Sequence, residues 1–451
     1  MSGNSDLTQF FFALALLILF AHSFGHLFHR LKLPRVVGEI GGGLLLGPSV
    51  LGFFSPKTHA WLFSALGAEA QWLSMVHWFG LVLLMFISGF DLQKSLNRDD
   101  KRTILALTLG STVIPFIAGW NAPSIYDFSP YLGSQRNLLA LRIIIAIATA
   151  ITSIPVLTKI FIDLKIVNTH FAKIVLSTAT LHDVILWVAL AVATGLVSGE
   201  SSSISNIVSH VLITMSFFGV ALLVVPRVLR VLNGSEWNHL MRSSVGGYMF
   251  FICFLFAAVA SHLKISVVFG AMMAGIVVGM APEHFEKEKV YIKEVSLAFF
   301  IPLYFAIVGL KLDLVRHGDL LFFLWFLLFT TAFQLLGTMI AARAMRQDWL
   351  SSFNLGMAMS NRGGPAIVLA TIALDLGIIN ETFFVTLILI AIVTSLSSGA
   401  WFRYVLAKGL PLLKDRESLA QPANAIQFSN ARTAANGRHA IETLGSGTEA
   451  E

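Results

Sequence analysis

The chain contains 451 residues, of which 56% are hydrophobic and 12% are charged. Because a soluble domain carries about 25% charged residues, this composition excludes a soluble protein and predicts an integral membrane protein. The formal net charge of +6 does not indicate a nucleic-acid partner, since the basic residues lie in short loops, where they act as topology signals.

Apolar runs of about 17–25 residues are the unit in which membrane-spanning helices are counted. Residues 1–9 contain no Lys or Arg, so they lack the basic region of a cleaved signal peptide, and we expect the first run to be retained as a helix. We predict an all-α integral membrane protein with thirteen transmembrane helices in a membrane domain, 1–409, near residues 8–29, 33–52, 76–95, 103–120, 137–163, 170–198, 204–231, 243–263, 265–281, 297–315, 317–342, 350–377 and 381–406.

Two segments do not fit this pattern. Residues 283–296 alternate charged and apolar residues at helical spacing, which is typical of an amphipathic helix at the membrane interface. Residues 410–451 are polar and rich in Gly, Ala, Asn and Ser, which favours a disordered cytosolic tail.

The distribution of Lys and Arg predicts the orientation in the membrane. Thirteen crossings place the two termini on opposite sides. The loops after odd-numbered helices, together with the C-terminal end, hold 24 of the 31 Lys and Arg residues, and the other side holds five. Because basic loops stay in the cytoplasm, we predict an external N-terminus and a cytoplasmic C-terminus in the inner membrane of a bacterial-type cell.

The sequence also contains an internal repeat. Residues 31–47 (LKLPRVVGEIGGGLLLG) align without a gap with residues 263–279 (LKISVVFGAMMAGIVVG), and FISGFDL at 86–92 matches AIVGLKL at 306–312. The first copies belong to helices 2 and 3 and the second copies to helices 9 and 10, so the copies enter the membrane from opposite faces. This pattern predicts an inverted-repeat secondary transporter in which helices 1–6 repeat as 8–13 and 204–231 links them. The alternative is a coincidence of glycine-rich packing faces, which are common in membrane helices.

The carboxylate of Asp183 is the first candidate site, because it lies in the middle of an apolar run. A charged side chain at that depth costs about 2.5–3.5 kcal/mol or more and is a functional hypothesis by default. Asp183 either alternates between a proton and a metal cation or forms a purely structural salt bridge. Its neighbour His182 either titrates near neutral pH and tunes Asp183 or is a neutral hydrogen-bonding spacer.

Two interruptions of predicted helices accompany this acid. Hydroxyls of Thr149, Thr152 and Ser153 precede Pro155, which lacks a backbone N–H and breaks the fifth helix. Hydroxyl and carbonyl oxygens at such a break suit a hard monovalent cation; the alternative is a simple proline kink with hydroxyls bonded to the previous turn. The twelfth helix has an equivalent break, formed by Gly363, Gly364 and Pro365. Two broken helices in equivalent positions indicate a site near the middle of the membrane.

Three other charged residues lie in apolar runs. Arg362 needs acceptors, which are a carboxylate (Glu39 or Asp183) or the freed carbonyls, and we favour a structural role. Lys311 either pairs with Asp183 or extends to the surface. Glu39 is interpreted as a packing or gating acid.

Other residues argue against further chemistry. The spacing of His22, His26 and His29 could suit a metal, but no carboxylate or cysteine lies beside them, so a solvated helix face is expected. Cys253 is the only cysteine, which excludes disulfides and cysteine-based metal sites. No nucleotide-binding loop, nucleophile elbow or zinc signature is present, so we expect neither an enzyme nor a cofactor.

At these residues the chain resembles the monovalent cation:proton antiporter superfamily, in its cation:proton antiporter-2 (sodium/hydrogen exchanger) branch. The motifs that carry the resemblance occur in the family's order over nearly the whole membrane region: LPRVVGEIGGGLLLGPSVLG (33–52), FISGFDL, TAITSIPV, LHDVILW, PLYFAIVGLKLDL and MSNRGGPAIVLA. The resemblance implies a homodimer, a scaffold and a mobile core domain, two crossed discontinuous helices and elevator-like movement. It also implies that Asp183 binds the ion and the proton and that Arg362 is the core arginine.

The chain departs from the family at the site itself. Electrogenic sodium exchangers carry two adjacent acids, whereas this chain has His182 followed by Asp183. One carboxylate favours exchange of one cation for one proton, although the histidine could release a second proton. We predict a secondary antiporter of Na⁺ or K⁺ and H⁺ that works by alternating access. The alternatives are a proton-driven exporter of an organic substrate on the same scaffold, or a cation channel or sensor.

Overall fold

The computed structural model describes residues 3–31, 33–64, 67–92, 100–198, 204–235, 238–280 and 282–414. From residue 415 onward the predicted tail lies outside the described residues. The helices of the first half are α1 (Gly3–Arg30), α2 (Arg35–Leu46), α3 (Leu51–Phe54), α4 (Pro56–His59), α5 (Gly67–Leu92), α6 (Lys101–Asn121), α7 (Leu138–Ala150), α8 (Ile154–Asp163), α9 (His170–Ser198), α10 (Ile204–Leu223) and α11 (Val225–Asn233). Those of the second half are α12 (His239–Ser243), α13 (Val245–His262), α14 (Val267–Gly279), α15 (Pro282–Val295), α16 (Ile301–Leu310), α17 (Leu314–His317), α18 (Leu320–Ala344), α19 (Trp349–Met359), α20 (Gly363–Asp375) and α21 (Glu381–Ala407).

The predicted all-helical membrane fold is confirmed. Among the described residues, eleven helices are long and apolar enough to cross a membrane, and α14 and α20 are shorter apolar helices. Each of the thirteen predicted helices has a counterpart in this set. The fifth and twelfth are interrupted as expected, at 151–153 between α7 and α8 and at 360–362 between α19 and α20.

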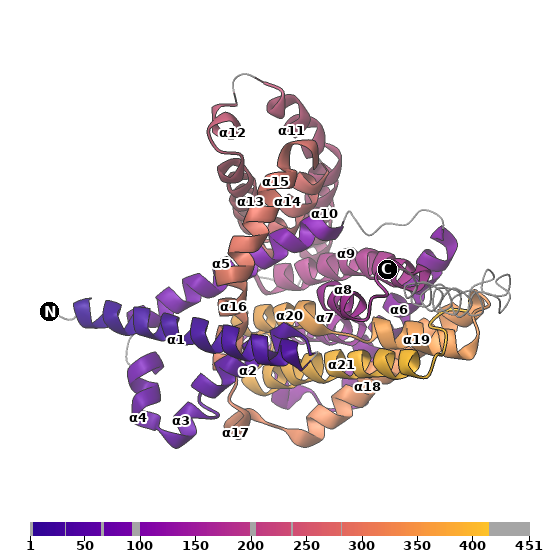
Figure 1. Cartoon of the computed structure of the whole chain (residues 1–451), viewed down its shortest axis with the longest axis horizontal. Coiled ribbons are helices and arrows are strands. Elements are labelled where there is room, and N and C mark those ends of the chain that lie inside the picture. Colours follow the sequence, from indigo (N-terminus) through magenta and orange to yellow (C-terminus); the bar gives the residue numbers. More distant parts are fainter. Residues whose placement is uncertain are drawn as a thin grey trace, which may run out of the picture.

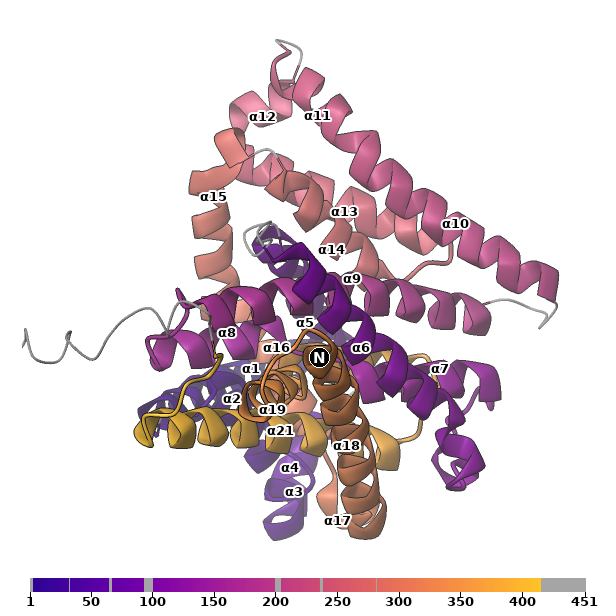
Figure 2. The same cartoon turned by 90° about the vertical axis from the view of Figure 1, so that its right-hand side faces the viewer.

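The segment 283–296 is helical, but it is not a separate element. It forms α15, which continues through a π-helical turn at Ser296–Phe300 into α16. Figure 2 shows α15 as the upper part of the column that leads to α16. Its place at the membrane interface stays a prediction, since the structure contains no membrane.

Contacts divide the helices into two bundles. The glycine-packed bundle contains α1, α2, α5, α13, α14 and α16, and the interrupted bundle contains α6–α9 and α18–α21. Between them, α10 packs on both α9 and α14, and α17 touches α21. In Figures 1 and 2, α10 to α15 rise above the rest of the molecule, while α18 to α21 lie together on the opposite side.

The glycine-packed bundle displays the inverted repeat in its contacts. A Cβ added to Gly43 of α2 would collide with the carbonyl oxygen of Ala306 in α16. A Cβ added to Gly275 of α14 would collide with the carbonyl oxygen of Phe86 in α5. Gly43 aligns with Gly275, and Ala306 aligns with Phe86, so the two copies make the same backbone contact, each on the other copy's helix. Only glycine permits this approach, as at other small-residue membrane interfaces.

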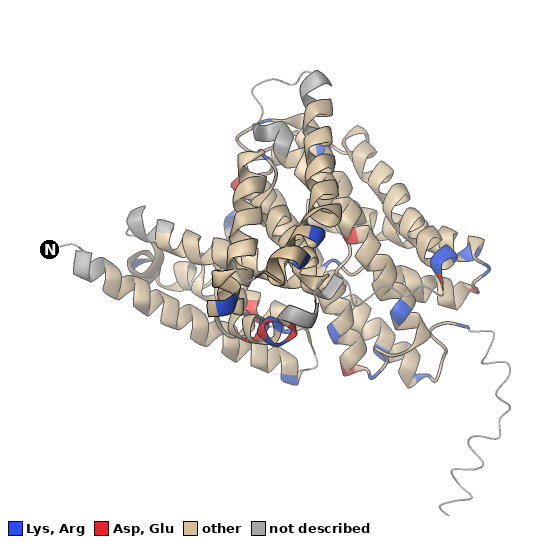
Figure 3. Ribbon diagram, turned by 90° about the horizontal axis from the view of Figure 1, so that it is seen from above, with Lys and Arg blue, Asp and Glu red and all other residues tan. Residues whose placement is uncertain are grey.

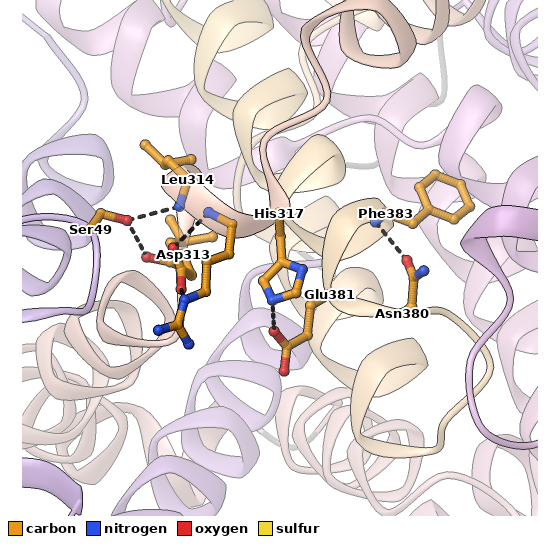
Figure 4. Close-up of polar contacts among 9 residues, drawn as sticks. Ser49, Asp313, Leu314, His317, Asn380, Glu381 and Phe383 are labelled. Atoms are coloured by element: carbon orange, nitrogen blue, oxygen red, sulfur yellow. Dashed lines mark hydrogen bonds and ion pairs between the residues drawn. The ribbon is translucent and has the colours of Figure 1, made fainter. Parts of the chain in front are cut away.

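The loops after even-numbered helices meet at one face of the molecule, called here the even face. Tyr131 donates its hydroxyl proton to Asp319 (2.9 Å), His317 pairs with Glu381 (2.6 Å), and the Ser49 hydroxyl accepts from the backbone N–H of Leu314 at the start of α17. Figure 4 shows these last two contacts side by side. Burial, with the bonds to Tyr126 and Asp319, raises the pKa of Tyr131, so its hydroxyl remains a donor.

The loops after odd-numbered helices meet at the opposite face, called here the odd face. His170 pairs with Asp100 (2.6 Å), and the backbone N–H of Lys414 donates to Ser351 (3.0 Å). Lys and Arg, blue in Figure 3, are concentrated at helix ends and connecting turns, whereas most of each helix is neither blue nor red and so carries no Lys, Arg, Asp or Glu. The two sets of contacts agree with the predicted alternation of thirteen crossings.

Candidate ion-binding site

The two helix interruptions touch each other directly. Ile151 and Ser153 are extended, and α8 begins at Ile154 with Pro155 in its first turn. The backbone N–H of Ser153 donates to the carbonyl of Asn361 at 2.6 Å. The Thr152 hydroxyl donates to the carbonyl of Met359, the last residue of α19, at 2.6 Å. The broken helices therefore cross at their unwound segments.

Glycine is required where the second break passes the first. Gly363 has φ +36°, and a Cβ on it would lie 2.5 Å from the Ser153 hydroxyl and from the Val156 side chain. Any other residue would suffer both the left-handed backbone and this overlap. Gly364 and Pro365 continue the start of α20, where a proline in the first turn loses no helical hydrogen bond.

Arg362 takes the freed carbonyls as its acceptors. Its side chain is 1% exposed and donates to the carbonyls of Ala148 (3.2 Å), Thr149 (3.1 Å) and Ser360 (3.2 Å). These contacts join the end of α7 to the second break and fit the structural role favoured from the sequence. The Ala148 and Thr149 carbonyls point toward the guanidinium group of Arg362. While they accept its hydrogen bonds, they are poor ligands for a transported cation.

Asp183 lies beside the first break, in α9. Its side chain is 6% exposed, and its Oδ1 has no hydrogen-bond partner among the described residues. It lines a recess with Ile147 and Ile151 of the first interrupted helix and Leu369 of α20. No described cation forms a salt bridge with Asp183, which leaves a purely structural ion pair without support. A buried carboxylate oxygen without a donor is costly, so it calls for a proton or a cation.

The three predicted hydroxyls have different surroundings. Thr149 donates to Ile145 one turn earlier in α7 (2.7 Å), and Thr152 donates across to Met359. The Ser153 hydroxyl is buried without a partner among the described residues. Because a hydroxyl that has donated its proton keeps its oxygen lone pairs, all three oxygens remain able to accept a cation or a water proton.

His182 lies on a different face of α9 from its neighbour, since successive helical residues are about 100° apart. The ring is fully buried beside the backbone of Ser111 in α6, and neither ring nitrogen has a well-formed hydrogen bond to any described residue. Both roles of His182, as a titrating group and as a neutral spacer, stay predictions.

The structure places Lys311 and Glu39 away from this crossing. Lys311 pairs with Asp375, and not with Asp183, at the even-face end of α20 (3.4 Å). Its side chain is 39% exposed and therefore reaches the surface. Glu39 is buried in α2 close to Gly25 of α1, inside the glycine-packed bundle. His22 donates to the carbonyl of Ala298 (2.9 Å), and no group of three metal ligands occurs among the described residues.

Sequence reasoning missed several residues of the crossing. Gln334 of α18 donates to the Met359 carbonyl (3.2 Å), Ser395 of α21 donates to the Asn361 side chain (3.1 Å), and Thr394 accepts from the Arg362 backbone N–H (3.3 Å). A glutamine within an apolar run was the one available signal, because polar side chains in membrane helices hydrogen-bond across helices.

Comparisons with known proteins identify cation:proton antiporters as similar in sequence and in fold. The family described as "Sodium/hydrogen exchanger, transmembrane" matches residues 13–408. The Na⁺/H⁺-K⁺ antiporter GerN of Bacillus cereus is 24% identical over 88% of this chain and 96% of its own length. The K⁺/H⁺ antiporter 1 of Saccharomyces cerevisiae is 25% identical over 87% of this chain, which spans only 46% of that protein. The sodium/proton antiporter MjNhaP1 of Methanocaldococcus jannaschii has the same fold, with a TM-score of 0.65 over 89% of this chain and 99% of its own, at 14% identity.

Proposed function

This chain belongs to the sodium/hydrogen exchanger transmembrane family, and from that premise we propose that it exchanges Na⁺ or K⁺ for H⁺ at Asp183. It is a multi-pass membrane protein and a secondary cation:proton antiporter by its family and relatives. One observation carries the assignment of the site: the buried carboxylate of Asp183, whose Oδ1 has no partner among the described residues, lines a recess with Ile151 of the first break and Leu369 of α20.

Asp183 serves two ligands in turn. In one half-cycle it holds a proton, and in the other it holds the cation together with oxygens of Thr149, Thr152 and Ser153. Moving the bare carboxylate through the membrane would carry charge through a medium of low dielectric constant, so the empty, ionised site does not cross. This penalty couples the two ions, and a single carboxylate gives exchange of one cation for one proton.

Two contacts between the bundles support alternating access. On the side of the odd face, a small pocket is lined by Pro34 and Val37, at the start of α2, and by Val156, Gly363 and Ser395 of the interrupted bundle. On the side of the even face, Lys311 pairs with Asp375, and Tyr304 and Thr371 lie within 3.5 Å of each other. We place the odd face in the cytoplasm, because its loops are the basic ones. We propose that the site exchanges ions with the cytoplasm from the side of this pocket.

The proposal extends to assembly and location. The chain works as a homodimer in the inner membrane, with the glycine-packed bundle as the scaffold and the interrupted bundle as the moving part. The division of contacts into two bundles, with few connections between them, supports the assignment of one bundle as scaffold and the other as the moving part.

Sealed proteoliposomes test the proposal. A pH-sensitive dye inside the vesicles should report proton movement when Na⁺, K⁺ or Li⁺ is added, and Asp183→Asn should abolish it while the protein stays folded. Asp163→Asn, which removes a half-exposed acid paired with Lys159 (2.7 Å), is the control and should retain exchange. The half-saturating cation concentration of the wild type should fall as pH rises, because protons and cations compete for one carboxylate.

Three results would count against the proposal. Full exchange in Asp183→Asn would show that Asp183 is not the ion-binding residue. Proton movement without added cations would favour an organic substrate. Cation flux without proton movement would indicate a channel.

A further inference from the structure

The carbonyl oxygen of Met359 is the point at which three elements meet. Met359 is the last residue of α19. Its carbonyl oxygen accepts a hydrogen bond from the Thr152 hydroxyl of the first break at 2.6 Å and another from Nε2 of Gln334 in α18 at 3.2 Å. A carbonyl oxygen has two lone pairs, so both of its acceptor positions are occupied. The carbonyl is consequently held in one direction and does not turn toward a cation.

The same contact decides how Thr152 faces the site. A hydroxyl has one proton and two lone pairs, and this proton is committed to Met359. Thr152 can then present only lone pairs to whatever lies beside it, which is the arrangement that a cation requires. The position of Thr152 Oγ1 depends on the position of the Met359 carbonyl, which Gln334 holds from the opposite side.

Gln334 is an expensive residue for simple helix packing. Its side chain is fully buried in α18, and Oε1 has no hydrogen-bond partner among the described residues. An unsatisfied buried acceptor destabilises the fold, and an apolar side chain of the same shape would avoid this cost. Thr330, one turn earlier on the same buried face, instead satisfies its hydroxyl within α18.

We propose that Gln334 is a positioning residue that determines which monovalent cation the exchanger prefers. By fixing the Met359 carbonyl, it fixes Thr152 Oγ1 relative to Asp183 and so sets the size of the oxygen cage. Discrimination among cations of equal charge depends on cavity size, ligand number and ligand flexibility. Loosening one ligand therefore weakens the discrimination among cations more than it changes the rate of exchange.

The inference rests on the proposed function and is tested with the full-length protein in proteoliposomes. Half-saturating concentrations of Li⁺, Na⁺ and K⁺ are measured for the wild type, Gln334→Met and the control Thr330→Val. Met matches Gln in length and removes both the donor and the orphan acceptor, so the fold should be retained. We expect the concentration ratios among the three cations to move toward one by at least about threefold in Gln334→Met and to stay unchanged in Thr330→Val.

Gln334→Glu supplies a second readout that a packing role would not move. A protonated Glu can donate to the Met359 carbonyl as the amide does, whereas an ionised Glu cannot. The cation ratios of this variant should match the wild type at acidic pH and depart from it as pH rises. Restored selectivity at low pH identifies the donated hydrogen bond as the cause.

The outcomes separate the two proposals. If the wild type shows no coupled exchange, the proposed function fails. If the wild type exchanges ions and Asp183→Asn does not, but Gln334→Met keeps the wild-type ratios, only the role of Gln334 is overturned. A wild type that does not discriminate among the three cations, or Gln334→Glu ratios independent of pH, would overturn that role as well.

Discussion

The two bundles solve the packing of membrane helices in opposite ways. In the glycine-packed bundle, backbones touch through missing side chains, as at Gly43 against Ala306 and at Gly275 against Phe86. In the interrupted bundle, side chains reach across to satisfy backbone carbonyls, as Arg362 does for Ala148 and Thr149. The first kind of contact depends on shape alone, and the second depends on hydrogen bonds in a medium that offers no water.

Among the residues that the structure describes, each bundle buries one acid, and the difference between the two acids shows what makes an ion-binding site. Glu39 packs between continuous helices α2 and α1. Asp183 shares a recess with Ile151 of an unwound segment, and the next two residues of that segment, Thr152 and Ser153, carry hydroxyl oxygens. Burial is common to both acids, so burial alone does not identify an ion-binding carboxylate. The supply of oxygens at a helix break distinguishes Asp183.

The largest expected effect comes from adding bulk to the glycine-packed bundle. Gly43→Leu should prevent formation of the folded protein, because its Cβ would collide with the Ala306 backbone and a backbone cannot rotate away. Overpacking usually costs about 1–3 kcal/mol, and a collision with the backbone falls at or above the top of that range. Gly275→Leu should behave alike, since it makes the equivalent contact. Size-exclusion profiles of detergent-solubilised protein measure the loss.

Gly41→Leu is the matched control in the same helix, because a Cβ at Gly41 meets nothing within 4 Å. It should fold and elute as the wild type does. A well-folded Gly43→Leu protein would show that the helices can move apart, and the contrast between the two bundles would then lose its physical basis.

An intermediate effect is expected where hydrogen bonds hold the interrupted bundle. The amide of Arg362→Gln has two N–H donors for the three buried carbonyls of Ala148, Thr149 and Ser360, so at least one carbonyl loses its donor, at a cost of about 1–3 kcal/mol. We expect a clear fall in the thermal unfolding midpoint and loss of exchange. Arg362→Lys, which keeps the charge but not the planar set of donors, should recover part of both. Equal midpoints for Arg362→Gln and the wild type would contradict this account.

The smallest effect is expected at the even face, where the bundles meet through a half-exposed ion pair. Lys311→Gln removes the contact with Asp375, and such pairs contribute about 0–1 kcal/mol. The unfolding midpoint should not change, and the exchange rate should change by less than about fivefold, the equivalent of 1 kcal/mol. Asp375→Asn should match it, and the double variant should add nothing further. Complete loss of exchange in Lys311→Gln would move Lys311 into the site.

How far the sequence leads can be judged from individual residues. Apolar run lengths predicted all thirteen helices, and Pro155 and the Gly363–Pro365 run predicted the interruptions, because these signals act within a few residues of the chain. The glycines at 38–47 and 270–279 predicted the inverted repeat for the same reason. Only the separation of the segment 283–296 from the tenth helix differed, since an amphipathic helix can continue into an apolar one without a local stop signal.

The sequence by itself determined the class of protein, the order of its helices and the candidate carboxylate, because hydrophobicity, proline and glycine impose local constraints that packing does not override. Only the tertiary structure decided which acceptors Arg362 takes, that Lys311 pairs with Asp375, and that Gln334 and Thr152 share one carbonyl. These partners lie up to hundreds of residues apart, and a side chain in an apolar run carries no record of which helix will face it. Their identity follows from helix packing, which is a property of the whole chain.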